Sequence, residues 1–284
     1  MHRRRSVSTG LSYHSTGAED APLIVCLHGF PDIPRTWTPL TEHLCRGGYR
    51  VVSPWLPGYA PSSLEGPFDP LTLASTILSF VDELSPSVPV RIVGHDWGSI
   101  IVQCALAQRP DRFHAAVMLG VPHVLAFEAN LERYPRQLRR STYIALFQLP
   151  GVSDRIVKLR NFRFIEYLWK RWSPGFRPGE DYFDEVKLCL RSSMPSPLGY
   201  YRALKSPNVI RELRRLLGAG PIVVPTMYLH GERDGCIGPE MAKGQEGYFS
   251  ALFETLFFVD AGHCPQLETP DEVNAAILRW FERV

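Results

Sequence analysis

The segment Gly94-His95-Asp96-Trp97-Gly98 constrains this chain more than any other, because it follows directly after an apolar run at 88–93. Such a run predicts a strand buried inside a sheet, and the residues from Ser99 onward predict a helix. Small residues on both sides of Asp96 allow the chain to turn sharply between the two elements. The segment therefore predicts a strained turn that lifts the Asp96 side chain into a pocket.

A carboxylate at the apex of that turn favours one kind of chemistry. It can displace a leaving group at a saturated carbon and form an alkyl-enzyme ester, which water later cleaves at the carboxyl carbon. A serine at this point would normally attack carbonyl groups, but Ser99 lies beyond the apex, on the predicted helix. Asp96 therefore points away from an esterase and towards the hydrolysis of epoxides or haloalkanes.

Strand and helix patterns alternate along the first part of the chain. Residues 6–14 predict one or two short strands around Gly10. Further predicted strands cover 22–27, 51–56, 90–93 and 115–119, and predicted helices cover 37–46, 71–84 and 99–108. This alternation predicts an α/β fold with a mostly parallel, doubly wound sheet.

The pattern changes at Pro122. From there to about Gly220 the periodicity is helical and rich in aromatic residues and arginine. Strand patterns return at 222–229 and 255–259, and a closing amphipathic helix is predicted at 271–283. We therefore expect an α/β core built from residues 1–121 and 221–284, interrupted by a helical cap at 122–220.

Cleavage of an alkyl-enzyme ester needs a base that activates water and an acid that orients the base. His263 follows the last predicted strand in a Gly-containing loop, which can bring an imidazole over the turn at Asp96. Asp234 precedes His263 in the chain and follows another strand, as an orienting acid should. Glu232 is the nearest competitor for that role. We expect Asp96, His263 and Asp234 to act together.

The cleavage step also passes through an oxyanion, which needs two backbone N–H donors. One is expected from Trp97, directly after the nucleophile. The other is expected from Phe30 in the string His28-Gly29-Phe30-Pro31, where Pro31 fixes the turn without offering a competing donor.

These motifs together resemble the epoxide hydrolase branch of the α/β-hydrolase superfamily, and the resemblance covers essentially the whole chain. It implies two cap tyrosines that donate hydrogen bonds to the epoxide oxygen and protonate it as the ring opens. The matching positions are Tyr143 and Tyr201, with Tyr200 as the substitute for the second. The resemblance also implies a substrate site formed by Phe30, Pro31, Trp97 and Phe147. No metal and no organic cofactor is expected.

Haloalkane dehalogenases share the same turn, so Asp96 and Trp97 alone do not separate the two activities. Halide departure needs N–H donors but no proton, and the side chain of Phe30 cannot donate. A cap tryptophan, Trp169 or Trp172, could serve instead. The two tyrosines favour the epoxide. A remote alternative is a non-catalytic protein that binds a small molecule on a hydrolase scaffold.

The composition limits the binding partners and the cellular location that we expect for this protein. The formal net charge is +2, and apart from Arg3-Arg4-Arg5 the basic residues are scattered along the sequence, so nucleic-acid binding is not expected. The six cysteines show no ligand or disulfide spacing, which favours reduced thiols in the cytoplasm. No apolar run approaches the roughly 20 residues that span a bilayer. The expected partners are a small apolar epoxide and water, and a homodimer is left open.

Overall fold

The computed structural model describes residues 2–284. Eight strands form one sheet in the order β1-β2-β4-β3-β5-β6-β7-β8. Strands β3 to β8 run parallel, whereas β1 and β2 pair antiparallel at one edge. The strands are β1 His2–Arg5, β2 Ser12–Thr16, β3 Leu23–Leu27, β4 Arg50–Pro54, β5 Val90–His95, β6 Phe113–Leu119, β7 Thr226–Gly231 and β8 Phe253–Phe258. The expected α/β fold with a mostly parallel, doubly wound sheet is confirmed.

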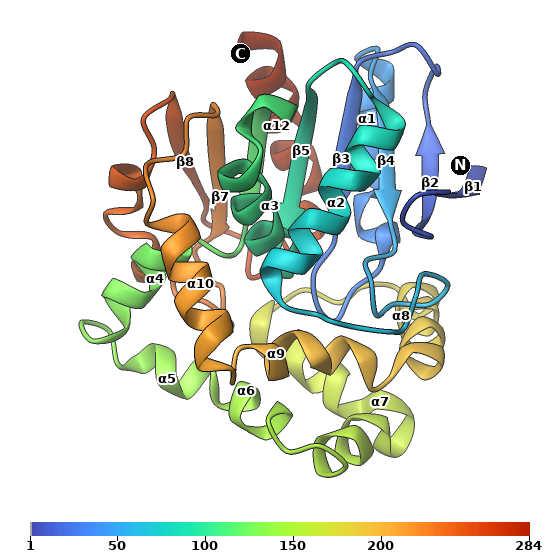
Figure 1. Cartoon of the computed structure of the whole chain (residues 1–284). Helices are drawn as coiled ribbons and strands as arrows, with labels where there is room; N and C mark the ends of the chain where they lie inside the picture. Colours follow the sequence, from blue (N-terminus) through green and yellow to red (C-terminus); the bar gives the residue numbers. More distant parts are fainter. Residues whose placement is uncertain (1) are drawn as a thin grey trace.

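Helices cover both faces of this sheet (Figure 1). Helices α2 (Pro70–Leu84) and α3 (Trp97–Gln108) pack together on one face. Helices α1 (Thr38–Arg46) and α12 (Pro270–Arg283) pack together on the other, and the short helix α11 (Pro265–Glu268) precedes α12. Because both faces are covered, an interior strand such as β3 has every residue buried, which explains its unbroken apolar sequence.

One predicted strand begins later than its apolar run suggests. The sequence predicts one continuous strand over residues 222–229, but β7 starts only at Thr226. Pro225 has no N–H to donate to a neighbouring strand. Ile222 forms only an isolated bridge with Phe249.

The described chain between β6 and β7 forms helices and turns without a sheet strand. These helices lie across the edge of the sheet where the parallel strands end (Figure 1), and we refer to them as the cap. They are α4 Val124–Leu131, α5 Arg136–Arg140, α6 Thr142–Phe147, α7 Val152–Trp172, α8 Glu180–Ser193, α9 Gly199–Ala203 and α10 Pro207–Leu217.

Specific contacts hold the cap on the core. The Tyr182 hydroxyl of α8 donates to Asp32 Oδ1 at 2.5 Å, and burial raises the pKa of this Asp32 carboxyl to about 6. Arg35 forms ion pairs with Asp181 and Glu185 of the same helix. Further along the edge, Tyr200 of α9 enters the buried apolar cluster.

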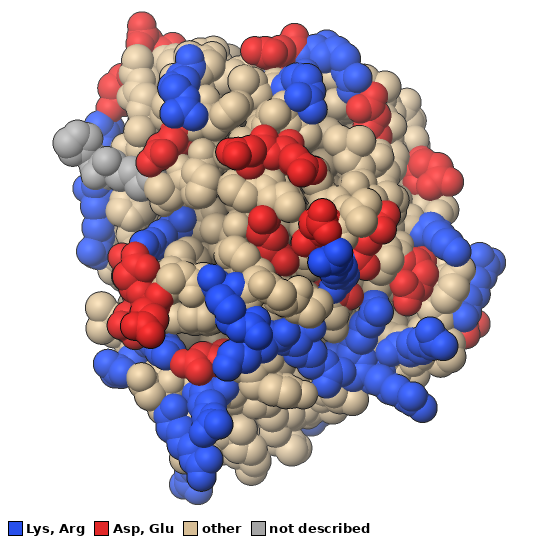
Figure 2. Space-filling view, turned by 180° about the vertical axis from the view of Figure 1, so that it is seen from behind, with Lys and Arg blue, Asp and Glu red and all other residues tan. Residues whose placement is uncertain are grey.

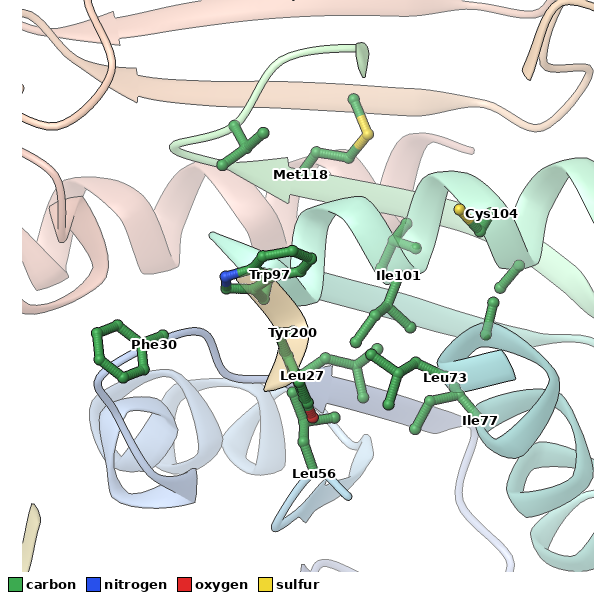
Figure 3. Packing of buried hydrophobic residues seen from close by; sticks show 14 of the residues in the cluster. Leu27, Phe30, Leu56, Leu73, Ile77, Trp97, Ile101, Cys104, Met118 and Tyr200 are labelled. Atoms are coloured by element: carbon green, nitrogen blue, oxygen red, sulfur yellow. The ribbon is translucent and has the colours of Figure 1, made fainter. Parts of the chain in front are cut away.

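Figure 3 shows Tyr200 among core residues that include Leu27, Leu56 and Trp97. Its ring lies 5.3 Å from that of Trp97, in an edge-to-face arrangement. Core and cap therefore share one continuous apolar interior at the edge where the site residues lie.

Candidate active site

Asp96 occupies a sharp turn between β5 and α3. Its backbone has φ 52° and ψ −116°, a combination that costs a non-glycine residue about 1–3 kcal/mol. The turn needs Gly98, because a Cβ atom there would lie 2.3 Å from the Leu27 carbonyl oxygen of β3. The neighbouring strand thus packs directly against the turn and holds Asp96 in its strained conformation.

The loop after β3 approaches the same carboxylate. The backbone N–H of Phe30 donates to Asp96 Oδ1 at 2.7 Å. Gly29 permits this approach, since a Cβ atom there would lie 2.4 Å from the Cβ of Asp96. Trp97 is the first residue of α3, where N–H groups have no partner inside the helix. Both amides expected at the oxyanion site therefore belong to segments that surround Asp96.

His263 and Asp234 also lie beside Asp96, in loops that follow β8 and β7. Nε2 of His263 is 3.5 Å from Asp96 Oδ2, and its Nδ1 is 2.8 Å from Asp234 Oδ2. The other oxygen of Asp234 accepts N–H groups of Cys236 and Ile237 at 2.6 and 2.9 Å. Asp96, His263 and Asp234 are all buried. Four strand ends therefore bring the nucleophile, base, acid and one amide together.

The competing carboxylate, Glu232, lies elsewhere. Its side chain is exposed, and the neighbouring Arg233 pairs with Asp260 at 2.7 Å. The geometry therefore favours Asp234 as the acid that orients His263.

The electrostatics of this group follow from its burial and its charges. Burial by itself would lower the pKa of His263, but attraction to Asp234 leads the opposing effects, to which the nearby Asp96 carboxylate adds. Together they hold the pKa of His263 well above its ordinary value. Burial opposes ionisation of Asp234, yet His263 outweighs it and lowers the pKa of Asp234. The resting site therefore favours an imidazolium between two carboxylates.

Two further histidines beside the site, His28 and His95, have specific hydrogen-bond partners. Nε2 of His95 lies 2.8 Å from the His263 carbonyl oxygen and so positions the base. Nδ1 of His28 lies 2.9 Å from the Gly29 carbonyl oxygen, and its Nε2 accepts the Leu56 N–H at 3.2 Å. Burial lowers the pKa of both imidazoles to about 4. Both rings are therefore neutral hydrogen-bonding groups at neutral pH.

The cap takes part in positioning the base through a group that sequence patterns do not reveal. The carbonyl oxygen of Trp172, at the end of α7, accepts the N–H groups of His263 and Gly235, each at 3.0 Å. Gly235 directly follows Asp234, so one cap carbonyl holds both catalytic loops. The ring of Trp172 also packs edge-on against His263, with centroids 5.4 Å apart.

A cavity of about 210 Å³ lies between core and cap. Asp96 and the side chains of Tyr143 and Tyr201 line it, together with a mostly apolar wall from α3, α4, α6 and α10. That wall includes Trp97, Ile100, Val121, Val124, Phe127, Leu131, Ile144, Leu204, Ile210, Leu213 and Ile237, with Glu128 as its one further charged residue. The cavity therefore brings one carboxylate and two phenols together in apolar surroundings.

The three candidate tyrosines differ in what their hydroxyls contact. The Tyr200 hydroxyl donates to the Pro57 carbonyl oxygen at 2.5 Å, and is thereby occupied. The Tyr143 hydroxyl lies 3.5 Å from Cys236 Sγ. The buried Tyr201 hydroxyl has no hydrogen-bond partner within residues 2–284. Tyr201 is thus better placed than Tyr200 to bind a substrate oxygen.

The other residues that were expected to contact the substrate are not part of the cavity lining. Phe147 packs on Phe30 and Tyr201, with ring centroids 5.4 and 5.0 Å apart, and Pro31 follows Phe30 in the loop. Of the four residues expected to contact the substrate, Trp97 lines the cavity, whereas the described lining does not include Phe30, Pro31 or Phe147, nor the alternatives Trp169 and Trp172. These residues therefore do not form the surface of the cavity.

Other kinds of site are not evident in the described part of the chain. No three His, Cys, Asp or Glu residues among 2–284 gather as ligands for a metal ion. None of the helices described is both long and apolar enough to traverse a bilayer.

Known proteins resemble this chain along nearly its whole length. Epoxide hydrolase 3 of Xenopus tropicalis is 29% identical over 286 residues, which cover 96% of this chain and 75% of that protein. An epoxide hydrolase of Caballeronia sordidicola is 27% identical and covers 98% of this chain and 92% of its own.

Among solved structures, the Bacillus megaterium epoxide hydrolase in complex with an inhibitor superposes with a TM-score of 0.84. It is 24% identical, and the match covers 98% of this chain and 100% of that one. The family model for the alpha/beta hydrolase family matches residues 24–276. The chain therefore belongs to the alpha/beta hydrolase family.

Proposed function

We propose that the protein is an epoxide hydrolase that converts an apolar epoxide into a vicinal diol through an ester of Asp96. The observation that carries the proposal is that Asp96, Tyr143 and Tyr201 line one cavity, beside which His263 and Asp234 lie. The activities named for the relatives in X. tropicalis and C. sordidicola agree with it.

In the first step, an Asp96 oxygen forms a bond to one epoxide carbon, and the bond from that carbon to the epoxide oxygen breaks. The departing alkoxide takes a proton from Tyr143 or Tyr201, which becomes a phenolate. Burial, followed by nearby charges, raises the pKa of both tyrosines well above the ordinary value. Both phenols are therefore protonated before the reaction and can serve as acids.

In the second step, His263 removes a proton from water as the water oxygen attacks the ester carbonyl carbon. The Phe30 and Trp97 amides stabilise the oxyanion, and the protonated His263 returns its proton to the departing diol oxygen. The phenolate of the first step takes the proton that His263 carries in the resting site, which leaves His263 neutral and able to act as the base. Asp96 is left as a carboxylic acid, whose proton returns to His263. The sum is one epoxide plus one water giving one diol.

The alternative leaving group, a halide, is tested by comparing substrates. Tyr143→Phe and Tyr201→Phe are each expected to lower kcat/KM for an aryl epoxide by about 10- to 100-fold, and the double variant by about 10⁴-fold, because general acids contribute 10²- to 10⁴-fold. Tyr200→Phe is the matched control. It should keep the activity and lose about 1 kcal/mol of stability with the bond to Pro57.

Initial rates on styrene oxide and on 1-chlorohexane measure these effects. The proposal expects epoxide turnover that depends on the two phenols and little release of chloride. Rapid chloride release that survives in the double variant would establish a dehalogenase instead.

The ester-cleavage step is expected to depend on pH through His263, which must be neutral to act as a base. The Asp96 carboxylate is one of the groups that raise the pKa of His263 in the resting site. Ester formation converts this carboxylate into a neutral ester. The pKa should therefore fall once the ester has formed. Below that value the cleavage rate constant should decrease about tenfold per pH unit.

Single-turnover kinetics across pH, compared with NMR titration of His263 in the free enzyme, measure both values. The expected result is a plateau reached at a pH below the resting pKa of His263. A cleavage rate that does not change with pH would contradict the assigned base.

A further inference from the structure

Charge is distributed unequally between the cap and the rest of the chain. Residues 122–220 carry 18 of the 31 Lys and Arg residues but only 9 of the 29 Asp and Glu residues. The cap therefore has a formal net charge of +9, and the remainder has −7. Figure 2 shows Lys and Arg gathered over the lower part of the visible face, where the cap lies, and more Asp and Glu above it. Basic residues that look scattered in sequence are thus concentrated in space.

Helix α7 is the most one-sided part of this surface. Its two carboxylates are neutralised by other helices, Asp154 by Arg202 and Glu166 by Lys187. Its exposed positions include six basic residues: Arg155, Lys158, Arg160, Arg163, Lys170 and Arg171. Among residues 2–284, none of these six forms an ion pair with a carboxylate. The outer face of α7 therefore presents positive charge without internal compensation.

Large apolar side chains are exposed within the same segment. Leu149 and Val152, on either side of an exposed Pro-Gly pair, are each 52% exposed, and Leu159 is 60% exposed. We call these three residues, with Arg155, Lys158, Arg160 and Arg163, the α7 patch. Val152 begins the first helical segment of α7, and Leu159 ends it, because the backbone is non-helical from Leu159 to Phe162. Arg155 and Lys158 lie between these two apolar residues. The patch thus combines apolar and cationic side chains within the 15 residues 149–163.

We propose that the α7 patch docks on the surface of an anionic phospholipid bilayer. Basic side chains are attracted to anionic headgroups, while exposed leucine and valine can enter the boundary between headgroups and acyl chains. A nucleic acid would satisfy the charges but would leave the apolar side chains in water. Since no described helix can cross a bilayer, the association is peripheral.

Docking through the α7 patch would also affect how substrate reaches the cavity. Only this consequence for substrate supply rests on the proposed function. Tyr143 of α6 lines the cavity, and Leu149 lies in the turn that directly follows this helix. An apolar epoxide concentrates in lipid rather than in water. Docking through the α7 patch would bring the cavity close to that reservoir.

Sedimentation with lipid vesicles tests the docking itself and needs no activity measurement. The wild-type chain is expected to sediment with vesicles of phosphatidylcholine and phosphatidylglycerol, to remain in solution with pure phosphatidylcholine, and to dissociate as salt is added. Arg155→Glu/Lys158→Glu should weaken binding by about 25-fold or more, because each cation near the surface contributes roughly fivefold. Leu149→Ser/Val152→Ser should weaken it as well.

The matched control is Arg46→Glu/Arg279→Glu, which makes the same change of charge at two exposed positions on α1 and α12. It should bind vesicles like the wild type, and circular dichroism should show that all variants are folded. If this control lost as much vesicle binding as Arg155→Glu/Lys158→Glu, binding would depend on net charge alone, and the proposal would be overturned. Absence of binding to anionic vesicles would also overturn it. So would tight binding to duplex DNA, together with vesicle binding that Leu149→Ser/Val152→Ser leaves unchanged.

Discussion

Replacement of Asp96 by alanine is expected to lower kcat/KM for an aryl epoxide by at least about 10⁴-fold, since loss of a covalent nucleophile has effects of this size or larger. The variant retains His263, Asp234 and both phenols, so it can still bind the epoxide. It lacks the oxygen that forms the new bond to carbon. No ester should form, and mass spectrometry of the protein after mixing with substrate should show its unmodified mass.

Asp260→Ala is the matched control for this variant. Asp260 lies in the same loop as His263, but its carboxylate is on the surface and pairs with Arg233. Its removal should change kcat/KM by less than about twofold, as is usual for surface substitutions. Diol formation that persists at the wild-type rate in Asp96→Ala, with the control also active, would eliminate Asp96 as the nucleophile.

Replacement of His263 by glutamine is expected to separate the two halves of the reaction. Ester formation needs the Asp96 carboxylate and the phenols, whereas ester cleavage needs the base. Cleavage should slow by about 10²- to 10⁴-fold, the usual contribution of a general base. The variant should therefore accumulate protein heavier by the mass of the whole epoxide.

Rapid mixing followed by proteolysis locates this added mass. The account expects it on the peptide that contains Asp96, with a first step close to the wild-type rate. His114→Gln, at an exposed histidine of β6, is the matched control and should accumulate no adduct. Failure of His263→Gln to accumulate adduct while turnover is lost would assign His263 to the first step instead.

The sequence predicts the fold well because its main signals are local. The run Leu23–Leu27 is apolar at every position since both faces of the sheet are covered, and this marks a strand without knowledge of its neighbours. The Gly residues around Asp96 are similarly diagnostic, because a sharp turn between a strand and a helix requires small residues. The close approach of Gly98 to Leu27 of β3 is a distant contact that the structure adds. The start of the strand after the cap is predicted less well, since Ile222 is apolar but forms only an isolated bridge with Phe249.

Features that depend on distant contacts could not be predicted in this way. The Trp172 carbonyl holds the loops of His263 and Gly235, but a backbone oxygen has no sequence signature. The choice between Tyr200 and Tyr201 depends on the Pro57 carbonyl, which lies far away in the chain. The positive surface of α7 likewise depends on pairing of Asp154 and Glu166 with other helices.

The most direct test of the account is a single turnover in water labelled with oxygen-18, with enzyme in excess over an aryl epoxide. If Asp96 forms an ester that water cleaves at the carboxyl carbon, the first diol carries no label. The peptide containing Asp96 gains one labelled oxygen. A first diol that carries the label, with unlabelled Asp96, would show direct attack of water on the epoxide and contradict the ester.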